Sequence, residues 1–128
     1  MSAAPKTILV VDDAALVRTY YRSILEGAGF QVEEALNGLE ALETLLGGMV
    51  DLLVVDINMP QMDGLTFLRT LRQKQGPLAA IPALVTSTES AEADFAAARE
   101  AGANFYLRKP VEREQLVLFA RMLCGVAS

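Results

Sequence analysis

The sequence predicts an α/β domain built around one parallel β-sheet, and three observations support this prediction. Short runs of β-branched and aliphatic residues alternate with longer stretches in which apolar residues recur at helical spacing. Gly, Pro and Asn residues separate these segments, and the connections between them are short. The chain has 128 residues, 52% of them hydrophobic and 21% charged, which is enough to bury a single core. We therefore expect residues 1–128 to form one domain with its core at about residues 6–125.

The first two strand–helix units are expected in the N-terminal third of the chain. Residues 6–11 form an apolar run without polar alternation, which is typical of a strand buried on both faces. Residues 14–28 carry apolar side chains at helical spacing and end among glycines, as helices commonly do. Residues 30–35 read as a half-polar strand, and the leucine-rich helix that follows has Asn37 as its expected N-cap and stops at Gly47.

Three further strand–helix units follow. Residues 51–56 are the most apolar strand candidate, and residues 63–75 carry leucines and Phe67 at helical spacing until Gly76 and Pro77 break the pattern. The remaining segments are strands at residues 82–86 and 104–107, an alanine-rich helix at residues 90–101, and a last helix at residues 111–123.

This strict alternation defines the architecture. Short connections between parallel strands are right-handed crossovers in which each helix packs back onto the sheet. Five such units in a chain of this length predict a flavodoxin-like, doubly wound (βα)5 domain with strand order 2-1-3-4-5. Ligands of such sheets bind at the carboxyl ends of the strands, so the residues that follow each strand are the candidate functional residues.

Composition excludes several classes of function. The chain has no histidine, which removes Ser/His/Asp and Cys/His catalysis and histidine-ligated zinc. Its formal net charge of −5 disfavours binding to nucleic-acid backbones. Cys124 is the one cysteine, so no intrachain disulfide can form and a reducing compartment fits best. The apolar runs are too short for a signal peptide or a membrane span, and we expect a cytoplasmic protein that binds neither nucleic acid nor membrane.

Acidic residues follow two of the expected strands. Asp12 and Asp13 come directly after the first strand, and Asp56 ends the third. A single aspartate at a strand end is more often a helix cap or a turn residue. Three at the same edge repel one another unless a cation lies among them. Because the site has oxygen ligands and no His or Cys, the sequence predicts Mg²⁺ or Mn²⁺.

Several motifs in order along the chain carry a resemblance to a known family. They are the Asp12-Asp13 pair, the stretch DINMP at residues 56–60 with Asp63-Gly64, a hydroxyl residue after the fourth strand, and Lys109-Pro110. Together they resemble the receiver domain of bacterial two-component response regulators, and in particular its CheY-like single-domain group. The similarity runs from residue 7 to about residue 125, and each motif taken alone is weak.

The resemblance implies a role for each of these residues. Asp56 would accept a phosphoryl group from a histidine kinase or a small phosphodonor. Asp13 and Asp56 would ligate Mg²⁺ with their side chains, Asn58 with its backbone carbonyl and Asp12 through water. Lys109 would pair with Asp56 and then with the phosphoryl oxygens. The physics agrees, because phosphoryl transfer depends mainly on positioning and charge neutralisation.

The resemblance also implies a conformational switch. The switch hydroxyl falls on Ser87, with Thr86 as the alternative, and Thr88 is a departure from the small residue that the family usually has next. Tyr106 matches the aromatic switch residue, although a tyrosine beside Phe105 can simply pack in the core. On the switch interpretation, movement of the hydroxyl lets the tyrosine rotate and reshapes the surface of the fourth helix, fifth strand and fifth helix, where a protein target binds.

Alternative interpretations change either the protein to which the receiver belongs or the reaction at the site. The last expected helix ends within a few residues of position 128, so we expect a stand-alone protein that acts in chemotaxis or as a phosphorelay shuttle. A receiver fragment of a larger regulator or hybrid kinase is the nearer rival. A phosphatase with an aspartate nucleophile would need a second Asp where Asn58 stands, and a flavodoxin would need a phosphate-cradling loop after the first strand.

Two further expectations concern the oligomeric state and the exposure of basic side chains. We expect a monomer, or a dimer that forms on phosphorylation, which catalyses only its own phosphorylation and dephosphorylation. The cations Arg69, Arg72 and Lys74 of the third helix are expected on a solvated face, with contact to the kinase as the alternative.

Overall fold

A computed structural model describes residues 4–89 and 92–126 of the chain. In this part of the chain, five parallel strands form one sheet in the order β2-β1-β3-β4-β5. The predicted strand order and fold class are confirmed. The strands are β1 (Thr7–Val11), β2 (Gln31–Ala35), β3 (Leu52–Asp56), β4 (Ala83–Ser87) and β5 (Phe105–Arg108).

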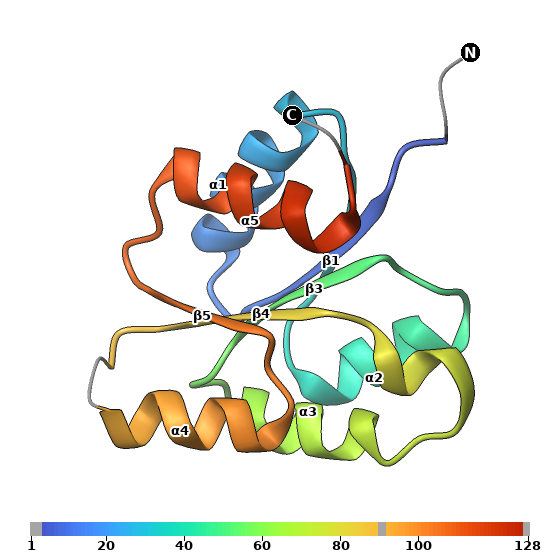
Figure 1. The fold of residues 1–128 in the computed structure, drawn as a ribbon, viewed down its shortest axis with the longest axis vertical. Coiled ribbons are helices and arrows are strands. Elements are labelled where there is room, and N and C mark those ends of the chain that lie inside the picture. Colours follow the sequence, from blue (N-terminus) through green and yellow to red (C-terminus); the bar gives the residue numbers. More distant parts are fainter. Residues whose placement is uncertain (1–3, 90–91, 127–128) are drawn as a thin grey trace.

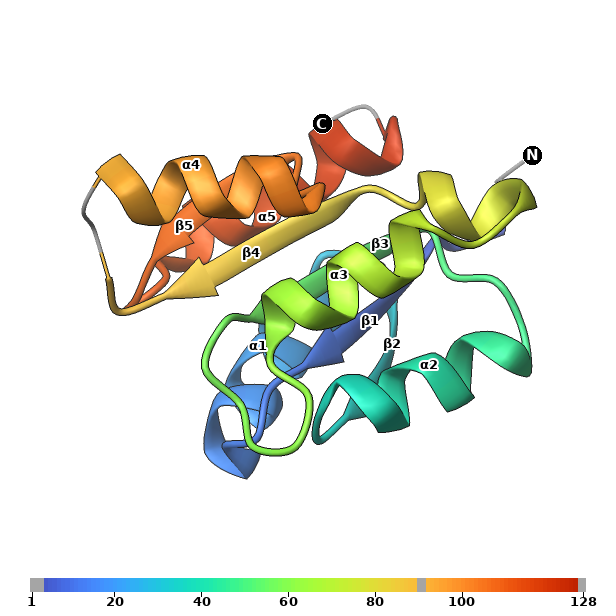
Figure 2. The same cartoon turned by 90° about the horizontal axis from the view of Figure 1, so that it is seen from below.

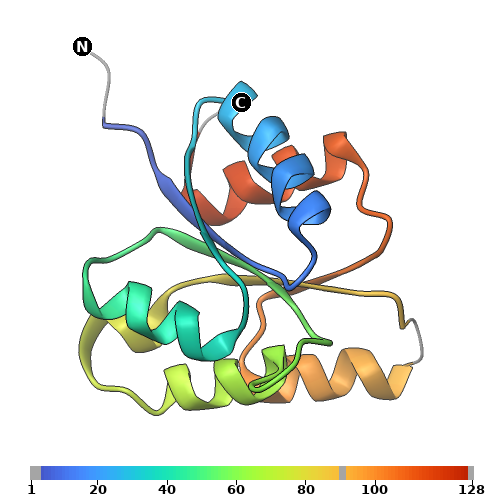
Figure 3. The same cartoon turned by 180° about the vertical axis from the view of Figure 1, so that it is seen from behind.

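Helices cover both faces of the sheet. Helices α1 and α5 lie on one face, and α2, α3 and α4 lie on the other (Figures 1 and 3). Each face buries its own apolar cluster, because successive side chains of a strand point to opposite sides. The helices are α1 (Ala15–Gly27), α2 (Gly38–Leu46), α3 (Gly64–Arg72), α4 (Glu92–Ala101) and α5 (Arg113–Cys124).

The burial of the strands explains their sequences. Strands β3 and β4 are buried along their whole length, and so is β1 after its first residue, because these strands are central and covered on both sides. The edge strands β2 and β5 are partly exposed, which agrees with their polar residues. All five strands run in the same direction, so their carboxyl ends lie at one edge of the sheet (Figure 2).

The third helix ends earlier than predicted. It stops at Arg72 instead of residue 75, and a short 3-10 helix that the sequence did not predict, η1 (Gly76–Ala80), follows it. The Gln73 and Lys74 backbone N–H groups donate to carbonyls three residues back, so the last turn is tightened and the α-helix ends. The predicted start of the fourth helix at Ser90 lies outside the described residues.

Helix caps set the entry of the chain into α2 and α3. The Asn37 side chain accepts from the Glu40 N–H at 2.9 Å, as predicted, and the Glu40 carboxylate in turn accepts from the Leu36 N–H at 2.9 Å. Asp63 caps α3 by accepting from the Thr66 N–H at 2.8 Å. Within the described residues, none of the helices combines the length and the apolar character needed to cross a lipid bilayer.

Candidate functional site

Three carboxylates converge at the carboxyl edge of the sheet. Asp12 follows β1 and Asp56 ends β3, and these strands are neighbours in which Val11 pairs with Val55. One carboxylate oxygen from each of Asp12, Asp13 and Asp56 lies within 4.8 Å of the other two. Asp12 and Asp56 are 1% and 4% exposed, whereas Asp13 faces solvent. The structure therefore brings together the three acids that the sequence singled out.

Lys109 reaches this cluster from the loop after β5. Its ammonium lies 2.9 Å from Oδ2 of Asp12 and 3.3 Å from Oδ1 of Asp56. Its backbone N–H donates to the Ser87 carbonyl at 2.7 Å, which ties the lysine to the end of β4. The pairing expected with Asp56 is present, and the sequence did not predict the closer contact with Asp12.

Burial dominates the electrostatics of Asp56. Burial raises the pKa of Asp56 to about 6, the negative charge of Asp12 acts in the same direction, and the ammonium of Lys109 opposes both. Burial alone would lower the pKa of Lys109, but its hydrogen bond to Asp12 and the charge of Asp56 outweigh burial, so this pKa is raised. Lys109 is therefore protonated and positively charged at neutral pH. Asp56 is mostly ionised there, but burial of its charge is unfavourable for the folded state.

The acidic cluster fits a hard divalent cation. Its donors are carboxylate oxygens, two of them on nearly buried residues, and a single ammonium does not neutralise three carboxylates. Mg²⁺ and Mn²⁺ prefer such oxygen ligands, and they retain bound water where the protein supplies few of its own.

The two candidate hydroxyl residues lie on opposite faces of β4. Ser87 shares its face with Val85 and the α2–α4 side of the core, and Thr86 shares the α1/α5 side with Leu84. Both are fully buried. Ser87 Oγ accepts from the Glu89 N–H at 3.0 Å, whereas Thr86 Oγ1 has no hydrogen-bond partner among the described residues.

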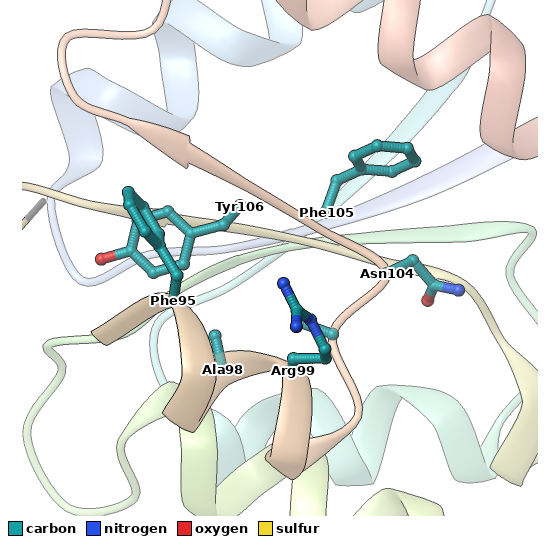
Figure 4. A pocket seen from close by; sticks show the side chains of 7 residues that line it. Phe95, Ala98, Arg99, Asn104, Phe105 and Tyr106 are labelled. Carbon is teal, nitrogen blue, oxygen red and sulfur yellow. The ribbon is translucent and has the colours of Figure 1, made fainter. Parts of the chain in front are cut away.

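Hydrogen bonds link Ser87 to Tyr106 through one residue. The Glu89 N–H donates to Ser87 Oγ, and the Glu89 carbonyl accepts from the Tyr106 hydroxyl at 2.9 Å. The Tyr106 ring meets Phe95 of α4 edge-on, with 4.4 Å between ring centroids (Figure 4). The ring of Phe105 instead packs on Phe119 of α5, with 4.8 Å between ring centroids.

A pocket of about 410 Å³ opens between α4 and β5 beside this tyrosine (Figure 4). Its aromatic lining residues are Phe95, Phe105 and Tyr106, and Arg99 and Asn104 form its polar rim. The pocket lies on the surface of α4 and β5, where the resemblance led us to expect a protein target.

The prediction of a solvated face was wrong for Arg72. This arginine is half-buried, and it donates to the backbone carbonyls of Gly102 at 2.7 and 3.0 Å, of Ile81 at 2.7 Å and of Ala79 at 3.0 Å. Arg69 and Lys74 are exposed, as expected. Arg72 therefore joins α3 to η1 and to the turn before β5, a structural role for which the sequence carries no local signal.

A buried tyrosine beneath the site was also not singled out by the sequence. Tyr21 of α1 is 2% exposed and lines a cavity of about 280 Å³ together with Lys109 and Thr88. Burial is the main cause that raises the pKa of Tyr21 to about 12, and Lys109 opposes it. A neighbouring Thr86 hydroxyl also lowers this pKa, although the contact lacks the geometry of a formed hydrogen bond.

Comparisons with known proteins agree with this geometry. Residues 8–121 match the model of the response regulator receiver domain. Response regulator MprA of Mycobacterium sp. (strain KMS) is 39% identical over 119 residues, which are 93% of this chain and 50% of that protein. The chain thus spans about half the length of the curated relatives it matches.

Solved structures share the fold. The chemotaxis protein CheY4 of Vibrio cholerae is 30% identical with a TM-score of 0.87, and the match covers 94% of this chain and 99% of that one. The signal receiver domain of a signal transduction histidine kinase from Syntrophus aciditrophicus is 32% identical with a TM-score of 0.86, over 94% and 90% of the two chains.

Proposed function

The chain belongs to the response regulator receiver domain family, and on that premise we propose that Asp56 accepts a phosphoryl group in a reaction that requires Mg²⁺. Receiver domains are phosphorylated by histidine kinases and signal to downstream targets. The observation that carries the proposal is the position of Asp56, nearly buried between a fixed ammonium and two further carboxylates. A carboxylate nucleophile needs no general base, so the absence of histidine from the sequence is no obstacle.

In the transfer step, a carboxylate oxygen of Asp56 forms a bond to phosphorus. The P–N bond of a phosphohistidine, or the P–O bond of a small acyl phosphate, breaks, and the leaving group keeps the electron pair. Lys109 donates hydrogen bonds to the phosphoryl oxygens and holds their negative charge. Because the pKa of Asp56 is about 6, its carboxylate form prevails at neutral pH.

Four residues would hold the cation. They are Asp13 and Asp56 through their side chains, Asn58 through its backbone carbonyl, and Asp12 through water. When bound, Mg²⁺ or Mn²⁺ would supply positive charge that offsets the negative charge of the carboxylates and of the phosphoryl group.

The signal would leave through Ser87 and Tyr106. In this proposal Ser87 turns its hydroxyl toward the phosphoryl group and releases the Glu89 N–H, and the loop that also holds the Tyr106 hydroxyl follows. The surface of α4, β5 and α5 then changes shape and binds a downstream protein. Thr86 is the less suitable hydroxyl because its Oγ1 has no hydrogen-bond partner among the described residues, whereas Ser87 Oγ accepts from the Glu89 N–H and is linked through Glu89 to Tyr106.

The proposed setting is that of a single receiver domain with its core at about residues 6–125, in the cytoplasm, as a monomer or as a dimer formed on phosphorylation. The chain would catalyse only its own phosphorylation and dephosphorylation. Similarity to CheY4 supports a stand-alone protein, with a role in chemotaxis or as a phosphorelay shuttle.

A second setting has its own support. The chain covers half of its curated relatives, and one similar structure is the receiver of a histidine kinase. Both facts favour the receiver portion of a larger regulator or hybrid kinase, in which the same chemistry at Asp56 would control a linked domain.

Intact-mass measurement tests the chemistry. The protein is incubated with acetyl phosphate and Mg²⁺, with chelator in place of Mg²⁺ as one control and with Asp56→Asn as the other. Asp63→Asn is the matched variant, because Asp63 is an exposed helix cap and asparagine caps equally well. We expect one phosphoryl group on the wild type and on Asp63→Asn and none in either control. A mass gain on Asp56→Asn, or no gain on the wild type from acetyl phosphate and from a phosphorylated kinase, would contradict the proposal.

A further inference from the structure

We propose that Arg18 is a positioning residue that fixes the backbone between Asp12 and Asp13 and thereby sets the affinity of the acidic cluster for a divalent cation. The inference rests on the proposed function, since it concerns the cation that the reaction would use. It assigns a role to a side chain outside the cluster itself.

Arg18 joins the acidic loop to the neighbouring strand. Its side chain, from the second turn of α1, is only 12% exposed. Nη1 donates to the backbone carbonyl of Asp12 at 2.7 Å, and Nε donates to the Glu34 carboxylate of β2 at 2.9 Å. A planar guanidinium holds two such partners in a fixed relative position, which an ammonium cannot do.

With this bond, both backbone groups and both carboxylate oxygens of Asp12 have a partner. Its N–H donates to the Ala35 carbonyl at 3.1 Å, its Oδ1 accepts from the Ala14 N–H at 2.9 Å, and its Oδ2 accepts from Lys109 at 2.9 Å. Arg18 supplies the partner of the remaining group, the carbonyl oxygen.

That carbonyl belongs to the peptide unit that joins the two acids. Because a peptide unit is planar, the direction of the Asp12 carbonyl also sets the direction of the Asp13 N–H and the position of the Asp13 Cα, from which the side chain extends. Asp13 faces solvent and has no comparable restraint of its own among the described contacts. Arg18 therefore restrains, through one hydrogen bond, the least buried ligand of the cluster.

Glu34 anchors the arginine. Its carboxylate also accepts from Nε of Arg22 at 2.6 Å, and Arg22 pairs in turn with Glu26 at 2.8 Å. The hydrogen bond from Arg22 is the main cause that lowers the pKa of Glu34, with Arg18 acting in the same direction. Arg22 thus shares the anchor but makes no contact with Asp12, which makes it the matched control.

Charge and geometry predict opposite effects, so they can be separated. Loss of the Arg18 charge alone would strengthen cation binding, because a positive charge would leave the neighbourhood. Loss of the restraint would weaken binding, because the ligands would lose their alignment. Arg18→Lys keeps the charge and loses the two-partner geometry, and Arg18→Met loses both.

The test is a titration of the metal-free protein with MgCl₂, followed by the backbone amide shifts of Asp13 and Asp56 in NMR spectra. We expect Arg18→Lys to weaken Mg²⁺ binding about 10-fold and Arg18→Met to weaken it as well. Arg22→Met should bind Mg²⁺ as the wild type does. Urea midpoints of all variants show how far each substitution affects the fold.

The outcomes are distinct. Wild-type affinity in Arg18→Lys, or an equal loss in Arg18→Lys and Arg22→Met, would overturn the positioning role, since a merely structural residue lowers the urea midpoint without a selective effect on Mg²⁺. If the Arg18 variants do not fold, Glu34→Gln weakens the anchor without touching Asp12, and we expect a smaller loss of affinity; an unchanged affinity there overturns the inference. A wild type that shows no Mg²⁺ response would contradict the proposed function itself.

Discussion

The ammonium of Lys109 lies 2.9 Å from Oδ2 of Asp12, closer than its 3.3 Å contact with Oδ1 of Asp56. The lysine ammonium therefore lies closest to Asp12, whereas the proposed nucleophile is Asp56. In the proposed reaction, Lys109 would turn to the phosphoryl oxygens on Asp56 and still keep Asp12 as a carboxylate partner. The positions of both charged groups are therefore largely set before the reaction, which is the preorganisation that electrostatic catalysis needs.

Neutralising Asp56 should stabilise the protein in buffer without divalent cations. Its pKa is raised from 3.8 to about 6, so the folded state holds a proton that the unfolded state has lost between these pH values, and stability falls as pH rises through this window. At pH 7.5, Asp56→Asn should raise the free energy of unfolding by about 1–3 kcal/mol. Urea unfolding from about pH 4 to pH 8 measures this, with Asp63→Asn as the control. Equal stability of Asp56→Asn and wild type at every pH would refute the expectation.

Removing the ammonium should make stability depend on metal. Lys109→Met leaves the nearly buried carboxylates of Asp12 and Asp56 without their cation, and a loss of about 3 kcal/mol is expected in the presence of chelator. An excess of Mg²⁺ should restore part of this stability, and more than it adds to the wild type, because the ion replaces positive charge. Urea midpoints with chelator and with Mg²⁺ check both statements. A variant that gains no more from Mg²⁺ than the wild type would argue that the ion does not take over the charge of Lys109, and no gain in either protein would argue against a cation site among these carboxylates.

The two hydroxyls of β4 should behave differently. Thr86→Val removes a buried hydroxyl without a hydrogen-bond partner, so stability should stay constant or rise by up to about 1 kcal/mol. Ser87→Ala removes the acceptor of the Glu89 N–H and should uncouple Tyr106 from phosphorylation. NMR signals of the Tyr106 ring, with and without acetyl phosphate and Mg²⁺, report the coupling. A response lost in Thr86→Val and kept in Ser87→Ala would reverse the assignment.

Arg72 should matter for stability in a way that Arg69 does not. Arg72→Met leaves carbonyls of Ala79, Ile81 and Gly102 without their donor, and about 2–4 kcal/mol of unfolding free energy should be lost. Arg69→Met, on the exposed side of the same helix, should change stability by less than about 0.5 kcal/mol. Thermal or urea unfolding of the two variants is sufficient. Similar small losses in both would show that the buried network contributes little.

The parts of the fold that depend on local patterns could be predicted from the sequence. Apolar runs without alternation marked the central strands, and the alternation of strands with helices gave the strand order. The same order explains why Asp12 and Asp56 meet, since the carboxyl ends of neighbouring parallel strands lie at one edge.

Contacts between distant segments could not be predicted in this way. The bonds from Arg72 to Gly102 and from Arg18 to the Asp12 carbonyl depend on side-chain directions after folding, not on any local pattern. The end of α3 at Arg72 is of the same kind, because residues 73–75 carry no residue that forbids a helix. The Lys109 ammonium is closer to Asp12 than to Asp56 by a fraction of an ångström, and the spacing of residues along the sequence cannot predict so small a difference.

Chemical trapping identifies which aspartate carries the phosphoryl group. After reaction with acetyl phosphate and Mg²⁺, borohydride reduces an aspartyl phosphate to homoserine, and tandem mass spectrometry of the peptides locates the change. We expect homoserine at position 56 and at no other aspartate. Homoserine at position 12 or 13, with position 56 unmodified, would contradict it.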